Sequence, residues 1–324
     1  MTTERTPADR TWLVAIAAAL WGTDGLLRLP LANALPPATV VFWEHLLVVL
    51  VLSPLVPRAL RALRGCGPRE WTAVLIIGGG SSALATALFT AAFRTGDPVT
   101  PLVLQKLQPV FVVLAAFFLL RERIRPGYAL FAAPALLGAW LLAFKNPLDI
   151  ELNALRAALL AIGAAVLWAA GTVLGRLVSN SLPARDVTVL RFTIGLPVSA
   201  AIVAVQGVSF VPGWANAPGL LLLAFIPGLL ALSLYYAGLR TTPASRATLA
   251  ELAFPATAAI IGVAFLNTTL TVTQWLGLLI VVAAVTALGW HEKVRAKPVV
   301  LEPAVSPPVA RHHPQRSAPR RSSL

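Results

Sequence analysis

Long uncharged runs recur between residues 12 and 290, separated by short segments rich in proline, glycine and asparagine. Each run approaches the ~20 residues with which a helix crosses the ~30 Å hydrocarbon layer of a membrane. The runs lack the polar and apolar alternation of transmembrane strands. The pattern predicts an all-α integral membrane protein with ten transmembrane helices, at residues 12–31, 37–56, 71–93, 99–120, 127–144, 155–176, 185–206, 217–238, 245–265 and 272–290.

The composition agrees with this class, because 57% of the 324 residues are hydrophobic and only 12% are charged. The net charge of +13 is typical of nucleic-acid binding as well as of membrane orientation. Twenty of the 26 Lys and Arg residues fall on the side of the two termini, and four, including Arg28, fall on the other side. This bias favours membrane orientation over nucleic-acid binding. It predicts a multi-pass protein of the cytoplasmic membrane with both termini in the cytoplasm.

The two ends of the chain differ in character. The first apolar run continues past Trp21, so we expect a spanning helix there and not a cleaved signal. Residues 291–324 are rich in proline, arginine and serine without helical periodicity. We expect these residues to form a disordered basic cytoplasmic tail.

An internal repeat divides the apolar part of the chain. Leu20 and Trp21 recur 147 residues later as Leu167 and Trp168, and Pro109 recurs 146 residues later as Pro255. The repeats at 12–144 and 155–290 each contain five expected spans. Because five is odd, the second repeat must lie inverted in the membrane relative to the first. Inverted repeats are an architecture of secondary transporters.

Two segments also resemble a known family. LQPVFVVLAAFFLLRERI, residues 107–124, resembles the fourth-helix signature of EamA-type proteins of the drug/metabolite transporter superfamily, and FPATAAIIGVAFLNTTLTVTQWLG, residues 254–277, resembles the corresponding segment of the second repeat. The resemblance covers residues 12–290 and implies ten helices, two EamA repeats and export or exchange of small metabolites. Glu122 keeps the family's acidic position, whereas Thr268 occupies it in the second repeat and Arg121 replaces the usual glycine.

Six ionisable residues lie inside the expected spans: Asp24, Glu44, His45, Lys106, Arg191 and Glu251. Each costs a few kcal/mol at the bilayer centre, so we expect it to face a cavity or a partner. At a rise of ~1.5 Å per residue, Glu44 and Lys106 lie about 10 Å below the outer surface. Arg191 and Glu251 lie about 9 Å above the inner surface, and Asp24 lies between the two layers.

We hypothesise that Lys106 and Glu251 face the translocation path and are offered to substrate or proton. The alternative for both layers is a structural ion pair that holds helices together. Gln105 and Gln108 share a helix face and bind either a solute or a facing helix. The further candidates for this pathway or its walls are Asp24, Glu44, His45, Arg191, Trp21, Trp168, Tyr235 and Tyr236.

Two prolines and a set of small residues predict how these helices bend and pack. Pro109 and Pro255 each free a backbone carbonyl inside a span, and we expect a hinge or a packing kink at each. The GGGSS run at residues 78–82 and the pair Gly171 and Gly175 favour close helix approach. GGGSS has neither the strand nor the following Gly-Lys-Ser/Thr of a phosphate loop.

These patterns predict a secondary transporter, in the export direction, for small organic metabolites such as amino acids or related polar compounds. We expect alternating access, a small-molecule substrate, the lipid bilayer and protons as partners, and a monomer or homodimer. No catalytic triad, metal-ligand spacing or cofactor motif stands out in the sequence, so we expect no catalytic residue, metal or cofactor. The alternative class is an intramembrane enzyme or a lipid-handling membrane protein.

Overall fold

The computed structural model describes residues 10–95, 98–120, 127–148, 151–178, 181–239, 250, 253–266 and 269–294. Helices lie in each of the ten stretches expected to span the membrane. The first half contains α1 Thr11–Gly22, α2 Asp24–Ala34, α3 Pro37–Leu52, η1 Ser53–Leu55, α4 Val56–Arg64, α5 Pro68–Leu75, η2 Ile76–Leu84, α6 Ala85–Ala92, α7 Val99–Leu104, η3 Gln105–Leu107, α8 Gln108–Leu120 and α9 Tyr128–Ala143. The second half contains α10 Leu152–Val178, α11 Ala184–Val205, η4 Trp214–Asn216, α12 Ala217–Leu223, η5 Ala224–Leu230, α13 Ala231–Leu239, α15 Ala253–Phe265 and α16 Val272–Val294.

Six helical stretches are long and apolar enough to cross a membrane by length and composition: Trp12–Ala34, Pro37–Arg64, Pro68–Ala92, Leu152–Gly175, Ala184–Val205 and Trp214–Tyr235. Shorter apolar helices follow at Val110–Leu119, Leu130–Leu142 and Val272–Ala284. The described residues thus confirm an all-α, multi-pass membrane protein. The arrangement of ten helices as two inverted repeats stays a prediction.

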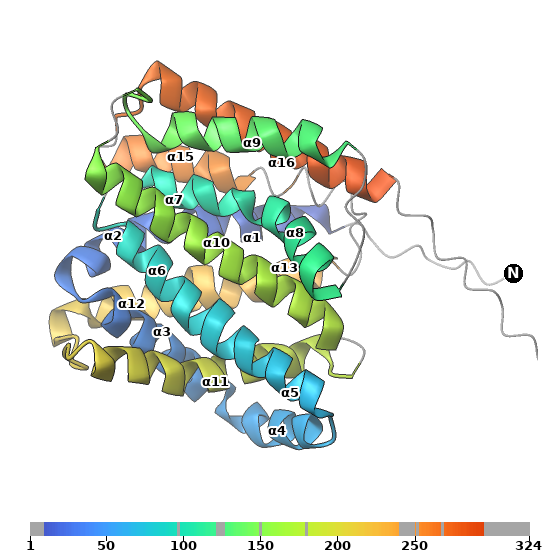
Figure 1. The fold of residues 1–324 in the computed structure, drawn as a ribbon. Coiled ribbons are helices and arrows are strands. Elements are labelled where there is room, and N and C mark those ends of the chain that lie inside the picture. The colour runs from blue at the N-terminus through green and yellow to red at the C-terminus, as the bar shows by residue number, and fades with distance from the viewer. Residues whose placement is uncertain are drawn as a thin grey trace, which may run out of the picture.

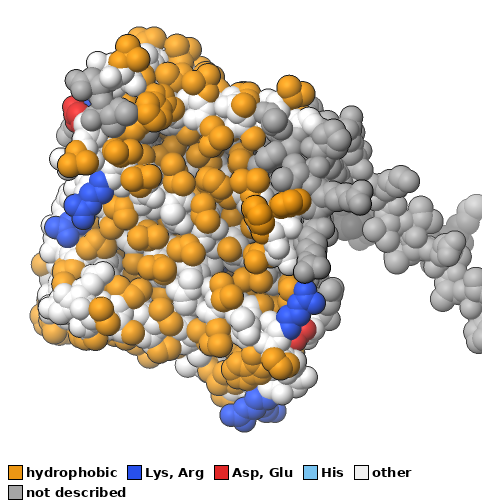
Figure 2. Space-filling view, in the orientation of Figure 1, with side chains coloured by type: hydrophobic (Ala, Val, Ile, Leu, Met, Phe, Trp, Pro, Cys, Tyr) orange, Lys and Arg blue, Asp and Glu red, His pale blue; other side chains and the backbone are white. Residues whose placement is uncertain are grey.

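The long helices run side by side from one end of the molecule to the other, with α9 packed on α16 at one edge and α3 on α11 at the other (Figure 1). Figure 2 shows hydrophobic side chains over the middle of one face, with charged side chains toward its ends. Large apolar side chains such as Phe118 and Leu130 are exposed. An apolar belt with charged ends is the surface that a lipid bilayer requires.

Two helices contain π-helical segments at matching places in the two halves. The helix α5–η2–α6 widens at Ile76–Leu84, and α12–η5–α13 widens at Ala224–Leu230, 148 residues later. The GGGSS run falls inside the first segment, and Pro227 with Gly228 falls inside the second. Such segments leave the regular α-helical hydrogen-bonding pattern and are frequent at functional sites.

Two helices extend beyond the expected spans, and a third stretch contains an internal 3₁₀ turn. The helix that begins at Pro37 continues through η1 and α4 to Arg64, and α4 buries Ala59 and Leu63 while its arginines are exposed. The α16 helix continues to Val294, into the expected tail. The α7–η3–α8 stretch tightens to a 3₁₀ turn at Gln105–Leu107, immediately before the first turn of α8, which contains Pro109.

The glycine pair expected to bring helices together acts through one member only. A Cβ on Gly171 would collide with the Oγ and Cβ of Ser81, whereas a Cβ on Gly175 would meet nothing within 4 Å. Gly78 likewise approaches Ile194, whose Cβ would lie 2.6 Å from a Cβ at position 78. Close approach is confirmed at Gly78 and Gly171, and the expectation for Gly175 is wrong because that residue lies beside the open cavity described below.

We expect Gly171→Ala to destabilise the folded protein by about 1–2 kcal/mol, since an extra methyl forced into a tight helix contact displaces its neighbours. Gly175→Ala, one turn along the same helix, is the matched control and should leave stability unchanged. Thermal unfolding of both purified variants in detergent measures the difference. Equal midpoints for the two variants would show that the α10 contact with η2 is looser than described.

Candidate central cavity

A cavity of about 540 Å³ opens between the helices of the two halves. Its volume lies in the range of pockets that hold small organic ligands. Eight of the residues proposed from the sequence for the pathway or its walls line it: Trp21, Asp24, Glu44, His45, Gln105, Gln108, Trp168 and Arg191. Residues that were not pathway candidates line it too, among them Arg28, Ser81, Ser82, Thr86, Phe89, Thr172 and Phe192. The fold therefore gathers at one place polar and aromatic groups that lie far apart along the chain.

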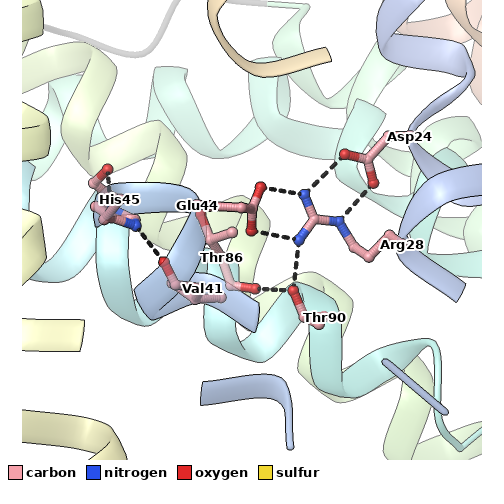
Figure 3. A network of polar contacts seen from close by, with 8 residues as sticks. Asp24, Arg28, Val41, Glu44, His45, Thr86 and Thr90 are labelled. Atoms are coloured by element: carbon pink, nitrogen blue, oxygen red, sulfur yellow. Dashed lines mark hydrogen bonds and ion pairs between the residues drawn. The ribbon is translucent and has the colours of Figure 1, made fainter. Parts of the chain in front are cut away.

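The strongest polar feature of this cavity is a cluster of Asp24, Arg28 and Glu44 (Figure 3). The Arg28 guanidinium donates Nε to Asp24 Oδ2 at 2.6 Å and Nη2 to Asp24 Oδ1 at 2.8 Å. It also donates Nη1 and Nη2 to the two oxygens of Glu44, both at 2.9 Å. Its fifth N–H, on Nη1, donates to Thr90 Oγ1 at 2.7 Å. All five donors of the guanidinium are used.

The position of Arg28 corrects the sequence analysis, which counted this residue with the outer surface. Arg28 lies in α2 and is only 4% exposed. It follows Asp24 by one helical turn, so the two side chains share a face, and Glu44 approaches from α3. Glu44 is thus paired with Arg28, and the side chain of Lys106, expected at the same depth, lies outside the description. The sequence signal for the contact between Asp24 and Arg28 is the Asp-x-x-x-Arg spacing inside an apolar run.

His45 lies on the side of α3 that faces away from Arg28 (Figure 3). Its Nδ1 lies 2.8 Å from the Val41 carbonyl, which only accepts hydrogen bonds, so Nδ1 carries a hydrogen. Its Nε2 lies 2.9 Å from Ser82 Oγ in the π-helical segment η2. Next to it, Arg191 Nη2 donates to the Ser81 carbonyl at 3.4 Å. The second polar group of the cavity thus joins α3 and α11 to η2.

Aromatic rings form the apolar part of the wall. The Phe89 ring packs edge-on against Trp168, with centroids 5.2 Å apart, and lies 5.5 Å from the Arg28 guanidinium carbon. Trp21 packs against Tyr235 at 4.9 Å. The amide of Gln108 donates to Thr172 Oγ1 at 3.0 Å, which links α8 to α10 beside these rings. A ligand in this space would meet flat apolar faces together with amide and hydroxyl groups.

Several sequence candidates cannot be placed in this cavity. Glu251, Glu122, Arg121 and Thr268 lie outside the described residues. Four others belong to described helices, but their side chains lie outside the description: Lys106, Pro109, Tyr236 and Pro255. Their proposed roles in the path, in its walls or as hinges stay predictions.

The cavity offers groups that can bind a solute. Both carboxylates of the cluster face the Arg28 guanidinium, and His45 is held between the Val41 carbonyl and the Ser82 hydroxyl. Among the described residues, no group of three or more His, Cys, Asp or Glu side chains could hold a metal ion. The arrangement can hold a solute that combines a flat apolar part with polar edges.

Comparison with known proteins relates the chain to transporters. The profile of the EamA-like transporter family matches residues 11–144 and 155–290. Riboflavin transporter ImpX of Fusobacterium nucleatum is 32% identical over 260 residues, which cover 75% of this chain and 85% of that protein. An uncharacterized transporter, YwfM, of Bacillus subtilis is 26% identical over 269 residues, which cover 82% and 88% of the two chains.

A solved crystal structure has the same overall arrangement of helices. It superposes with a TM-score of 0.56 and covers 88% of this chain and 99% of its own, at 20% sequence identity. At this identity the match concerns the fold alone. Two profile matches separated by ten residues, with no overlap, place one copy of the family's sequence pattern in each half of the chain.

Proposed function

Because the chain belongs to the EamA-like transporter family, we propose that it carries a small organic metabolite through the central cavity by alternating access. The proposal takes residues 12–144 and 155–290 as two inverted five-helix repeats whose relative movement exposes the cavity to each side in turn. It places the protein in the cytoplasmic membrane with both termini in the cytoplasm. The family assignment favours transport over the alternative, an intramembrane enzyme.

The observation that carries this proposal is the shared cavity. Residues of both family matches line it: Trp21, Glu44 and Gln105 come from the first, and Trp168 and Arg191 from the second. In transporters with internal repeats, the substrate site lies near the middle of the membrane at the interface of the repeats. A cavity built by both repeats supports transport through it, because movement of one repeat against the other would change its access.

Riboflavin is the first substrate to test. The relative that carries this name is 32% identical to the chain. Riboflavin combines a flat ring system with hydrogen-bonding groups along its edge and a polar chain. The rings of Trp168 and Phe89 can pack against the flat ring system of riboflavin. The amides of Gln105 and Gln108 can bond its polar groups.

Amino acids and related polar compounds are the second candidates. Carboxylates at Asp24 and Glu44 and a guanidinium at Arg191 line one cavity, and these opposite charges suit a zwitterion. Counterflow in proteoliposomes loaded with riboflavin or with an amino-acid mixture separates the two substrate classes. We propose outward transport, and this direction is tested by comparing inside-out with right-side-out vesicles.

If riboflavin stacks on the aromatic wall, Trp168→Ala should raise its dissociation constant by about 2- to 10-fold, since one aromatic contact is worth about 0.5–1.5 kcal/mol. Trp214→Ala is the matched control, because Trp214 is 94% exposed and does not line the cavity. Titration of the purified protein with riboflavin measures both constants. Equal affinities in both variants would remove Trp168 from the site.

A further inference from the structure

The cluster of Asp24, Arg28 and Glu44 contains two acids and one base. With both acids ionised, its net charge is −1, while the side chains of Arg28 and Glu44 are only 5% and 12% exposed. Because all five guanidinium N–H groups are already donated, Arg28 has no donor left with which to bind a substrate anion. Excess negative charge inside a membrane is costly, so the cluster attracts a compensating positive charge.

A proton meets this requirement better than a metal cation. Ca²⁺ and similar hard cations take several oxygen ligands in a shell around the ion. Here the oxygens of both carboxylates are directed at Arg28, which occupies the space between them (Figure 3). A proton needs one oxygen and no such space.

The geometry separates the two acids. Asp24 belongs to the same helix as Arg28, and its contacts of 2.6 and 2.8 Å are the shorter ones. Glu44 belongs to α3, and its contacts measure 2.9 Å. A proton on Asp24 would weaken a contact within α2. A proton on Glu44 would replace a charged, two-point contact between α2 and α3 with a weaker neutral one and leave Arg28 neutralised by Asp24.

The surroundings of Glu44 set how tightly it would hold a proton. On α3, His45 is directed to Val41 and Ser82, and α6 contributes the hydroxyls of Thr86 and Thr90 and the Phe89 ring. On α11, Arg191 also lines the cavity. The described part of α7 and η3 contributes the neutral amide of Gln105. Among the described residues, Arg28 is the charged group that is hydrogen-bonded directly to Glu44.

We propose that Glu44 binds and releases one proton in each transport cycle and that its protonation loosens α3 from α2. This inference rests on the proposed function, since it assigns the energy source of transport. Phe89 contacts both Arg28 and Trp168, so a change in the cluster reaches the aromatic wall directly. Asp24 is then a positioning residue that keeps Arg28 in place in both states.

The test compares Glu44→Gln with Glu151→Gln, an exposed glutamate outside the cavity lining. Proteoliposomes are assayed for riboflavin counterflow at equal pH on both sides and for accumulation driven by an imposed pH gradient. We expect the wild type and E151Q to show both activities, and E44Q to keep counterflow but lose gradient-driven accumulation. Gradient-driven accumulation by E44Q at the wild-type level overturns the assignment. The assignment is also overturned if the wild-type protein does not accumulate substrate in response to a pH gradient, or does so only in response to a sodium gradient.

A second measurement does not depend on transport. Infrared difference spectra of the purified protein between high and low pH contain the carbonyl bands of all carboxylates that take up a proton, and the wild-type spectrum minus the E44Q spectrum should leave one band, that of protonated Glu44. If E44Q does not fold, Glu44→Asp replaces it, and the band should shift in frequency. An unchanged band in either variant places the proton elsewhere and overturns the proposal. Absence of counterflow by the wild type with both riboflavin and amino acids would instead contradict the proposed function.

Discussion

Arg28→Gln is expected to destabilise the folded protein by about 3–5 kcal/mol, the cost of removing one partner from a buried ion pair. Without the guanidinium, Asp24 and Glu44 would face each other as two carboxylates in a buried site. The Thr90 hydroxyl would also lose the hydrogen bond that it accepts from Arg28. Ionisation of both acids together would be unfavourable. The hydrogen bonds from Arg28 of α2 to Glu44 of α3 and to Thr90 of α6 would be lost. The yield of monodisperse protein and its thermal midpoint in detergent measure this effect.

Two comparisons make the result specific to the buried charge. Arg58→Gln changes an exposed arginine of α4 and should alter stability by no more than about 0.5 kcal/mol. The triple variant Asp24→Asn, Arg28→Gln, Glu44→Gln removes all charge from the cluster and should regain a large part of the lost stability. Equal stability of the Arg28→Gln and Arg58→Gln proteins would contradict the description of the cluster as a buried, mutually dependent unit.

The helices could be predicted from the sequence because the bilayer allows few alternatives. Backbone groups in the hydrocarbon layer must bond within their own helix, so each long apolar run is a helix. The expected start of the second span, at residue 37, coincides with the start of α3 at Pro37, and proline favours the first turn of a helix. The helix continues to residue 64, eight residues past the expected end at residue 56, because the arginines of α4 lie on the exposed face of an amphipathic continuation. Apolar patterning does not distinguish a loop from an amphipathic continuation of a helix.

The cavity was predictable in its composition but not in its pairing. Asp24, Glu44 and Arg191 stood out as charges within apolar runs, and all three line the cavity. The charge pattern places Arg28 with the basic residues of the outer side because it lies near the end of the first expected span. The inward orientation of the Arg28 side chain depends on Glu44, which belongs to another helix. The depth of a residue along its own helix does not show which neighbouring helix its side chain faces.

The sequence does not predict the two π-helical segments. A run of three glycines, at residues 78–80, permits close packing in an α-helix as well as a wider turn, so the pattern alone does not choose. In the folded protein, Ser81 and Ser82 of this segment bond Arg191 and His45 from two other helices. Contacts of this kind, formed between distant parts of the chain, select the conformation that the local sequence leaves open.

Gly277→Ala is expected to destabilise the protein by about 3 kcal/mol, at the upper end of the usual cost of overpacking. A Cβ on Gly277 would lie 2.6 Å from the Gly138 carbonyl oxygen and 2.6 Å from the Leu142 nitrogen. These are backbone atoms, so no side-chain rotation relieves the clash, and α9 must move away from α16. That movement also weakens the bond from the buried Gln274 side chain to the Leu142 carbonyl.

The consequence should extend to the cavity, because α9 and α16 both contact η3, whose Gln105 lines it. The helices α9 and α16 contribute shorter apolar stretches than the six long spans, so they depend more on their mutual contact. We therefore expect Gly277→Ala to lower the thermal midpoint more than Gly171→Ala does and to weaken riboflavin binding as well. Gly175→Ala is the control for stability, and Trp214→Ala, which lies outside the cavity lining, is the control for binding. A Gly277→Ala protein of wild-type stability would mean that α9 and α16 can separate without cost, and the polar turn at η3 would then have to be held by α7, α8 and α10 alone.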